Sequence, residues 1–78
     1  MQDKLKKEIR NLIIKEFNLK KTKIKNLSTH NVENWDSFGH LRLISSIERH
    51  FKINLNQKNI VKMIDEKFIN SIIKQNIK

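Results

Sequence analysis

The chain has 78 residues, 37% of them hydrophobic, a net charge of +9 at neutral pH, and no cysteine. A chain of this length forms one domain that buries only about 60% of its unfolded surface, which leaves little room for an enclosed active site. Disulfides and thiolate metal sites are excluded, and the absence of an apolar membrane span or secretion signal predicts a single cytoplasmic domain over residues 1–78.

The first predicted helix covers residues 3–17. Its apolar residues recur at helical spacing, and Lys and Arg fill its other face. The apolar positions are Leu5, Ile9, Leu12, Ile13 and Phe17. The periodicity fails over residues 18–35, which predicts a long loop anchored by Ile24, Leu27 and Val32. Loops longer than about 12–15 residues are uncommon in compact domains and are often functional.

The second predicted helix covers residues 37–51. Asp36 or Ser37 is expected to be its N-cap, with Trp35 packing back on the first turn. We expect its main apolar stripe to consist of Phe38, Leu41, Ile44, Ile47 and Phe51, with Leu43 beside it. Gly39 costs a helix about 1 kcal/mol relative to alanine. A glycine here therefore predicts that some group approaches the backbone closely.

The last third of the chain continues the helical pattern. Ile53 and Leu55 of the connector are expected to reach the core, and Asn56 to cap the segment that follows. The later apolar positions are Ile60, Val61, Ile64, Phe68, Ile69, Ile72 and Ile73. Periodicity alone allows one helix over 57–75 or a short helix followed by another. Asp65 and Glu66 are typical of a first helical turn and favour the break. The prediction is an all-α, small four-helix bundle with three longer helices, a short third helix and a long first loop.

The basic residues are unevenly distributed. Residues 1–25 hold nine basic and three acidic side chains, residues 52–78 hold six and two, and residues 31–51 have a net charge of −1. One interpretation is a small basic helical module that binds nucleic acid. Solvated helix faces in a chain rich in Lys, Ile and Asn are the favoured alternative. One Trp, no Tyr and a nearly neutral central helix also argue against nucleic acid.

Side chains capable of chemistry are few. His30, His40 and His50 lie in separate elements without ligand spacing, so no metal site is predicted. Ser37 and His40 are one helical turn apart, but no third orienting group or oxyanion site accompanies them, and we expect no catalytic residue and no enzyme. The local pattern around Ser37 is that of a helix cap. A serine there also lies where free N–H groups and the helix dipole stabilise an attached phosphate.

Residues 32–41 carry the most specific motif, VENWDSFGHL, between a helix with a long loop and a second helix. In this context the chain resembles the acyl carrier protein family. Asp36, Ser37 and Phe38 match the family's Asp-Ser-Leu, and Glu48 and Phe51 lie at matching offsets. The likeness covers nearly the whole chain. The motif around Ser37 is most similar to that of free-standing bacterial carriers of dedicated pathways, such as those of surface polysaccharides. It is less similar to the motif of the housekeeping carrier of fatty acid biosynthesis.

The resemblance implies that Ser37 carries 4'-phosphopantetheine, transferred from coenzyme A by a phosphopantetheinyl transferase. The thiol of this arm would hold an acyl or aminoacyl group as a thioester, and the carrier itself would catalyse nothing. The other implied partners are an acyl- or aminoacyl-loading ligase and an acyltransferase. The protein is expected to be a monomer.

The resemblance also implies roles for the residues around the serine. Recognition by the transferase and partners would fall to Asp36, Phe38, Gly39, Arg42, Leu43 and Glu48, with Asp36 helping the transferase to hold metal and coenzyme A. Gly39 would leave the backbone open to partners. The cargo would lie against core residues that face it, namely Phe38, Leu41, Ile44, Ile47, Phe51 and Phe68.

One departure from the family affects the choice of partners. The family's second helix carries several carboxylates, where this chain has Arg42, Glu48 and Arg49. This implies pathway-specific partners that are acidic near their tunnels.

A third interpretation is a scaffold that carries nothing and binds a partner helix through Leu43 and its neighbours. The intact pair of Asp36 and Ser37 argues against that interpretation.

Overall fold

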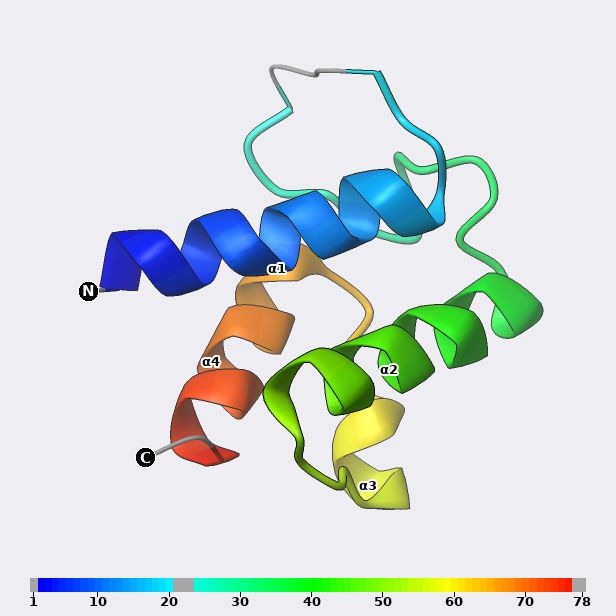
Figure 1. Cartoon of the computed structure of the whole chain (residues 1–78). Coiled ribbons are helices and arrows are strands. Elements are labelled where there is room, and N and C mark those ends of the chain that lie inside the picture. The colour runs from blue at the N-terminus through cyan, green and yellow to red at the C-terminus, as the bar shows by residue number, and fades with distance from the viewer. Residues whose placement is uncertain (1, 21–23, 77–78) are drawn as a thin grey trace.

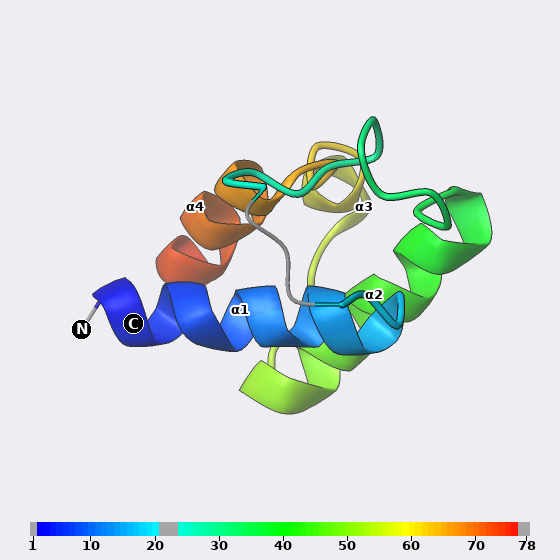
Figure 2. The same ribbon diagram turned by 90° about the horizontal axis from the view of Figure 1, so that it is seen from above.

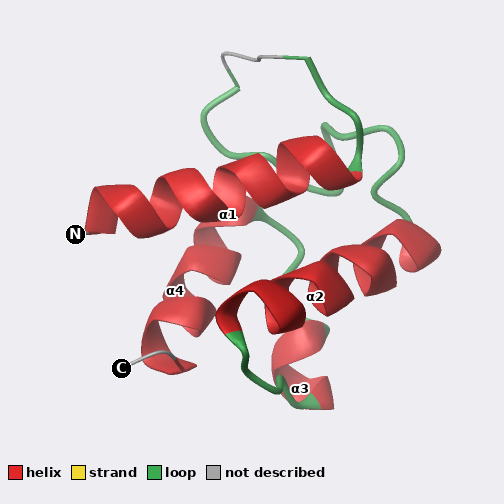
Figure 3. Cartoon of the chain, in the orientation of Figure 1, coloured by secondary structure: helices red, strands yellow, loops and turns green. Residues whose placement is uncertain are grey.

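The computed structural model describes residues 2–20 and 24–76, which contain α1 (Gln2–Glu16), α2 (Ser37–Phe51), α3 (Gln57–Ile60) and α4 (Glu66–Asn76). In Figure 1, α1 lies over α2 and α4, and the short α3 lies beside α2. The predicted all-α fold, with its short third helix and long first loop, is confirmed (Figure 3). Within the described ranges, no helix has the length and apolar character needed to cross a membrane.

Helix α1 packs against both α2 and α4. Ile9 and Ile13 are fully buried in this contact, Phe17 follows at the end of the helix, and Leu5 and Leu12 are half-buried beside them. The predicted apolar stripe of this helix is therefore confirmed. The charged positions of α1 lie outside the stripe, which leaves its Lys-rich face to solvent.

The predicted helix starts are confirmed by their capping hydrogen bonds. The Asp36 carboxylate accepts from the Gly39 N–H at 2.9 Å, and the Asn56 side chain accepts from the Asn59 N–H at 2.8 Å. The carboxylate of Asp65 accepts from the Phe68 N–H at 2.8 Å. These short polar side chains satisfy amides that the helices leave without an internal partner. The helical pattern is thus interrupted between α3 and α4, as the acidic pair of Asp65 and Glu66 predicted.

The buried face of α2 differs from the predicted stripe. It consists of Gly39, Leu43, Ile44 and Ile47, whereas Phe38 is 77% exposed and Leu41 58% exposed. Phe38 and Ile47 are nine residues, about two and a half helical turns, apart and so lie on opposite faces. Placing Phe38 and Leu41 in the core was therefore wrong. Leu43 is fully buried, which makes it unavailable to the partner surface predicted for it.

The apolar residues around the break also divide between core and surface. Met63, Ile69 and Ile73 are fully buried, whereas Phe68 is 52% exposed. Val61 and Ile64, in the turn that separates α3 from α4, are exposed as well. The break interrupts the helical phase for Val61 and Ile64. Within α4 the buried face is centred near Ile69, and Phe68 lies about 100° around the helix from it. The prediction of Phe68 as a core residue was wrong.

The loop between α1 and α2 is held against the start of α4 by backbone pairing. The Leu27 carbonyl accepts from the Glu66 N–H at 2.7 Å, and the Ile64 carbonyl accepts from the Thr29 N–H at 3.1 Å. These two hydrogen bonds flank an antiparallel bridge between Ser28 and Asp65. Figure 2 shows this stretch of the loop beside the beginning of α4. Leu27 and Val32 are buried as predicted, but Ile24 is 38% exposed. Residues 24–36 of the loop are therefore attached to the start of α4 before the chain reaches Ser37.

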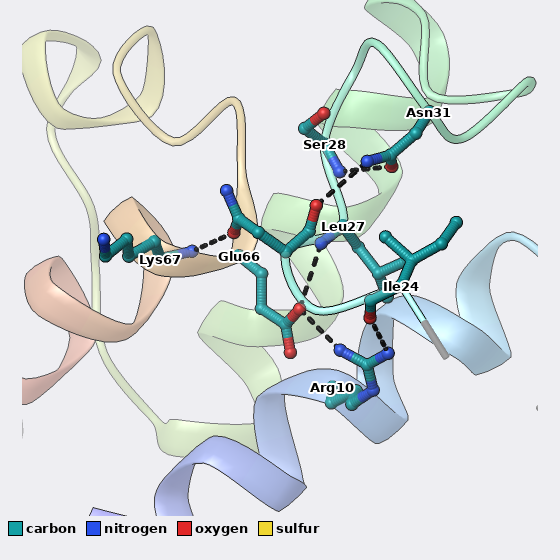
Figure 4. A network of polar contacts seen from close by, with 8 residues as sticks. Arg10, Ile24, Leu27, Ser28, Asn31, Glu66 and Lys67 are labelled. Carbon is teal, nitrogen blue, oxygen red and sulfur yellow. Dashed lines mark hydrogen bonds and ion pairs between the residues drawn. The ribbon is translucent and has the colours of Figure 1, made fainter. Parts of the chain in front are cut away.

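A buried carboxylate completes this attachment (Figure 4). Glu66 is only 6% exposed, and its Oε1 accepts from Arg10 Nη1 at 2.7 Å and from the Leu27 N–H at 3.1 Å. Arg10 also donates through Nη2 to the carbonyl of Ile24. The Lys67 N–H donates to the Asn26 side chain at 3.0 Å. This network joins α1, the loop and α4, which are far apart in the sequence.

Candidate functional site

Ser37 is the first residue of α2, and its side chain is exposed. The residue before it caps the helix: Asp36 accepts from the Gly39 N–H through its side chain and from the His40 N–H through its carbonyl at 2.7 Å. Among the described residues, no partner contacts the Ser37 hydroxyl or the N–H groups of Ser37 and Phe38. The start of α2 thus presents a free hydroxyl and two free amides at the positive end of a 15-residue helix.

Trp35 fixes the approach of the loop to this serine. Its ring is 3% exposed and stacks on Phe17, with ring centroids 5.3 Å apart. Its Nε1–H donates to Nδ1 of His40 at 3.0 Å, and Nε2 of His40 lies 2.8 Å from the carbonyl oxygen of Ile60. Because Nδ1 accepts, this network assigns the proton to Nε2, which donates to Ile60. His40 therefore links the loop, α2 and α3, and both of its nitrogens are engaged away from Ser37.

We expect His40→Ala to lower the free energy of unfolding by about 2 kcal/mol, because it leaves the buried Trp35 N–H without its acceptor. The Ile60 carbonyl also loses one of its two donors and keeps the Met63 N–H. His30→Ala is the matched control, since that side chain is exposed, and should change stability by less than about 0.5 kcal/mol. Urea unfolding measures both. Equal values for the two variants would contradict the structural role of His40.

Gly39 is buried, and the groups that approach it belong to this chain. A Cβ at this position would lie 2.7 Å from Cε1 of Phe17 and would also clash with the backbone oxygen of Asn34. The sequence-based expectation of a close approach to its backbone is met. The further expectation, that Gly39 stays open to partners, was wrong because Phe17 and Asn34 cover it.

The exposed face of α2 combines apolar and basic side chains. Phe38 and Leu41 are exposed on it. Arg42 forms an ion pair with Glu16 at 3.1 Å, and the Glu16 carboxylate also accepts from the Ser46 hydroxyl at 2.8 Å. A surface hollow of about 310 Å³ lies here, lined by Glu16, Phe38, Leu41, Arg42, Ser45, Ser46 and Arg49. A second hollow, of about 410 Å³, extends from Phe38 past Asp36 to the end of α1. The surface next to Ser37 is thus apolar at its centre with arginines beside it.

The other predicted site residues have mainly internal contacts. Glu48 is half-buried, and its Oε2 accepts from the Leu55 N–H at 2.8 Å, which holds the connector after α2. Ile44 and Ile47 lie in the core, and Phe51 is half-buried at its edge. The six residues predicted to face cargo are therefore divided between the core and the surface and do not line one cavity. In the described part of the chain, no group of three or more His, Asp or Glu side chains is placed to hold a metal ion.

Sequence reasoning missed the network of Arg10 and Glu66 and the link from Trp35 through His40 to Ile60. Each joins residues that are distant in the sequence, and the only local signal was an acidic residue at a helix start, which the helix dipole alone explains.

Comparisons with protein-family models, curated proteins and solved structures found no significant match to this chain.

Proposed function

We propose that the protein is an acyl or aminoacyl carrier whose 4'-phosphopantetheine arm is attached to the hydroxyl of Ser37. The observation that carries the proposal is that Asp36, not Ser37, caps α2. A serine that caps a helix uses its oxygen for a backbone amide. Here that task is done by the preceding residue, so the exposed hydroxyl of Ser37 is available for modification.

The residues at the start of α2 fit a phosphodiester. The free N–H groups of Ser37 and Phe38 point out of the positive end of the helix, where a negative charge is stabilised. Asp36 lies in the adjoining hollow, within reach of an enzyme that brings a metal ion and coenzyme A. When bound, the arm supplies the thiol that this cysteine-free chain lacks and holds the cargo as a thioester.

Phe38 and Leu41 have a role in this proposal that differs from core packing. Both are exposed on α2 close to Ser37, and exposed aromatic and aliphatic side chains are common anchors in protein contacts. Arg42 and Arg49 line the same hollow. A transferase, ligase or acyltransferase that covers this face would meet an apolar centre and a basic edge, which favours partners with acidic groups there.

Mass spectrometry of the intact protein after co-expression with a broad-specificity phosphopantetheinyl transferase tests the proposal. We expect the wild type to gain the mass of one phosphopantetheine group and Ser37→Ala to gain none. Ser71→Ala is the matched control, because Ser71 is an exposed serine on α4, outside the hollows next to Ser37, and it should be modified like the wild type. Asp36 keeps its capping role in the Ser37→Ala variant, so that variant should remain folded.

Two results would contradict the proposal. One is a wild-type protein that stays unmodified with several different transferases. The other is modification that persists in Ser37→Ala, which would place the attachment on another residue. Circular dichroism of each variant verifies that the helices are present before either result is interpreted.

A further inference from the structure

A second surface feature lies between α1 and α4. Two adjoining hollows, of about 190 and 320 Å³, share Lys6, Lys67 and Asn70. The first is completed by Leu5, Ser71 and Lys74, and the second by Lys25, Asn26 and Glu66. We call this surface the α1–α4 groove. In Figure 1, α4 and the beginning of α2 lie at opposite ends of the molecule. Ser37 is the first residue of α2, so the groove is separate from the proposed arm.

The groove has a strong positive charge. Four lysines line it, and among the side chains that the structure describes, those of residues 4–20 and 24–76, no carboxylate lies within ion-pair distance of them. The one carboxylate in its lining, that of Glu66, is buried and already binds Arg10 and the Leu27 N–H. Ammonium groups gathered around one hollow raise the local potential and attract an anion.

Two polar side chains between the lysines, those of Asn70 and Ser71, have no hydrogen bond within the described chain. Asn70 Oδ1 is buried and has no hydrogen bond within the described chain. The NH₂ group of Asn70 has no hydrogen-bond partner in the described chain either, which leaves it available as a donor to an anion. Ser71, exposed in the same lining, adds a hydroxyl donor.

The donor set favours phosphate over carboxylate and over a long nucleic acid. The oxygens of a phosphate group are arranged tetrahedrally and accept from lysines on several sides. The two oxygens of a carboxylate lie in one plane and are matched by the arginine fork, which also binds phosphate. Lys67 and Lys74 are separated by only about 10 Å along α4. Duplexes are held by rows of contacts, commonly six to ten phosphates in strong binders. Four lysines around a short hollow suit one or two phosphate groups.

We propose that the α1–α4 groove binds a phosphate group, supplied either by a small free phosphate compound or by the headgroup of an anionic phospholipid. The groove holds the anion through Lys6, Lys67 and Lys74, with Lys25 at its edge. Binding needs neither Ser37 nor an arm. A carrier held in this way keeps the start of α2 directed away from the bound anion.

Isothermal titration calorimetry with inorganic pyrophosphate at low salt tests the free source. Sedimentation with vesicles of phosphatidylglycerol, compared with neutral phosphatidylcholine, tests the lipid source. The groove variant carries Lys6→Gln, Lys67→Gln and Lys74→Gln. The control variant carries Lys15→Gln, Lys58→Gln and Lys62→Gln, which remove the same charge from exposed positions outside the groove lining. Circular dichroism verifies that both variants are folded.

We expect the groove variant to bind about tenfold more weakly or worse, and the control variant to stay within about threefold of wild type. Binding of pyrophosphate alone identifies a free phosphate ligand, and selective binding of the anionic vesicles identifies a lipid headgroup. Equal weakening in the two variants would overturn the proposal, as would absence of binding to both probes. A DNA duplex bound more tightly than either probe, and weakened equally by both triple substitutions, would replace it with a diffuse nucleic-acid surface.

Discussion

Glu66→Ala is expected to lower the free energy of unfolding by about 2–3 kcal/mol. Removing one partner of a buried ion pair typically costs about 3–5 kcal/mol, because the other charge stays buried and unpaired. The side chain of Arg10 is 25% exposed and that of Glu66 8% exposed, so solvent screens part of that loss. The substitution also leaves the Leu27 N–H without its acceptor. For a domain of this size, the change is a large part of the total stability.

Urea unfolding and amide hydrogen exchange measure this effect together. We expect the Leu27 amide to lose protection in Glu66→Ala, because the loop is then held to α4 by fewer bonds. Glu33→Ala is the matched control, since Glu33 is an exposed carboxylate in the same loop, and it should change stability by less than about 0.5 kcal/mol. If both variants were equally stable, the buried carboxylate would not be what attaches the loop.

Gly39→Ala is expected to destabilise the protein by about 2 kcal/mol, although helix propensity alone predicts the opposite sign. Alanine is favoured over glycine by about 1 kcal/mol inside a helix. Against this, the new Cβ would meet the Phe17 ring and the backbone oxygen of Asn34, and overpacking of this kind costs about 1–3 kcal/mol. A backbone carbonyl yields less readily than the end of a flexible side chain, so the steric cost dominates.

Thermal unfolding distinguishes the two effects. A loss of about 2 kcal/mol corresponds to a fall in Tm of about 8–16 °C for a domain of this size. Ser45→Ala serves as the control, because Ser45 is exposed on the same helix and reports propensity without the clash. A Gly39→Ala variant as stable as wild type, or more stable, would show that Phe17 and Asn34 move aside at little cost.

The elements of this fold were predictable where the signal is local. Asp36 and Asn56 are short polar side chains directly before apolar-periodic segments, and each caps the helix that follows. The acidic residues at 65 and 66 predicted the break before α4. These signals depend on neighbouring residues, because a cap bonds to amides within three residues of itself.

Exposure was harder to predict because periodicity does not state which part of a broad apolar arc meets the rest of the protein. On α2, Leu43 and Ile47 are buried in the core, whereas Phe38 is exposed. The roles of Gly39 and Glu66 depend on Phe17 and Arg10, which lie far away in the sequence. Such contacts depend on the tertiary structure, so they cannot be predicted from composition or local spacing.

The buried indole of Trp35 gives this protein a built-in optical reporter. The sequence contains one tryptophan and no tyrosine, so the ultraviolet fluorescence of the folded protein comes almost entirely from a single ring. That ring stacks on Phe17 at the end of α1 and donates to His40 in the first turn of α2. Its emission therefore reports on the junction that positions Ser37, and both unfolding and events at the start of α2 can be followed without an attached dye.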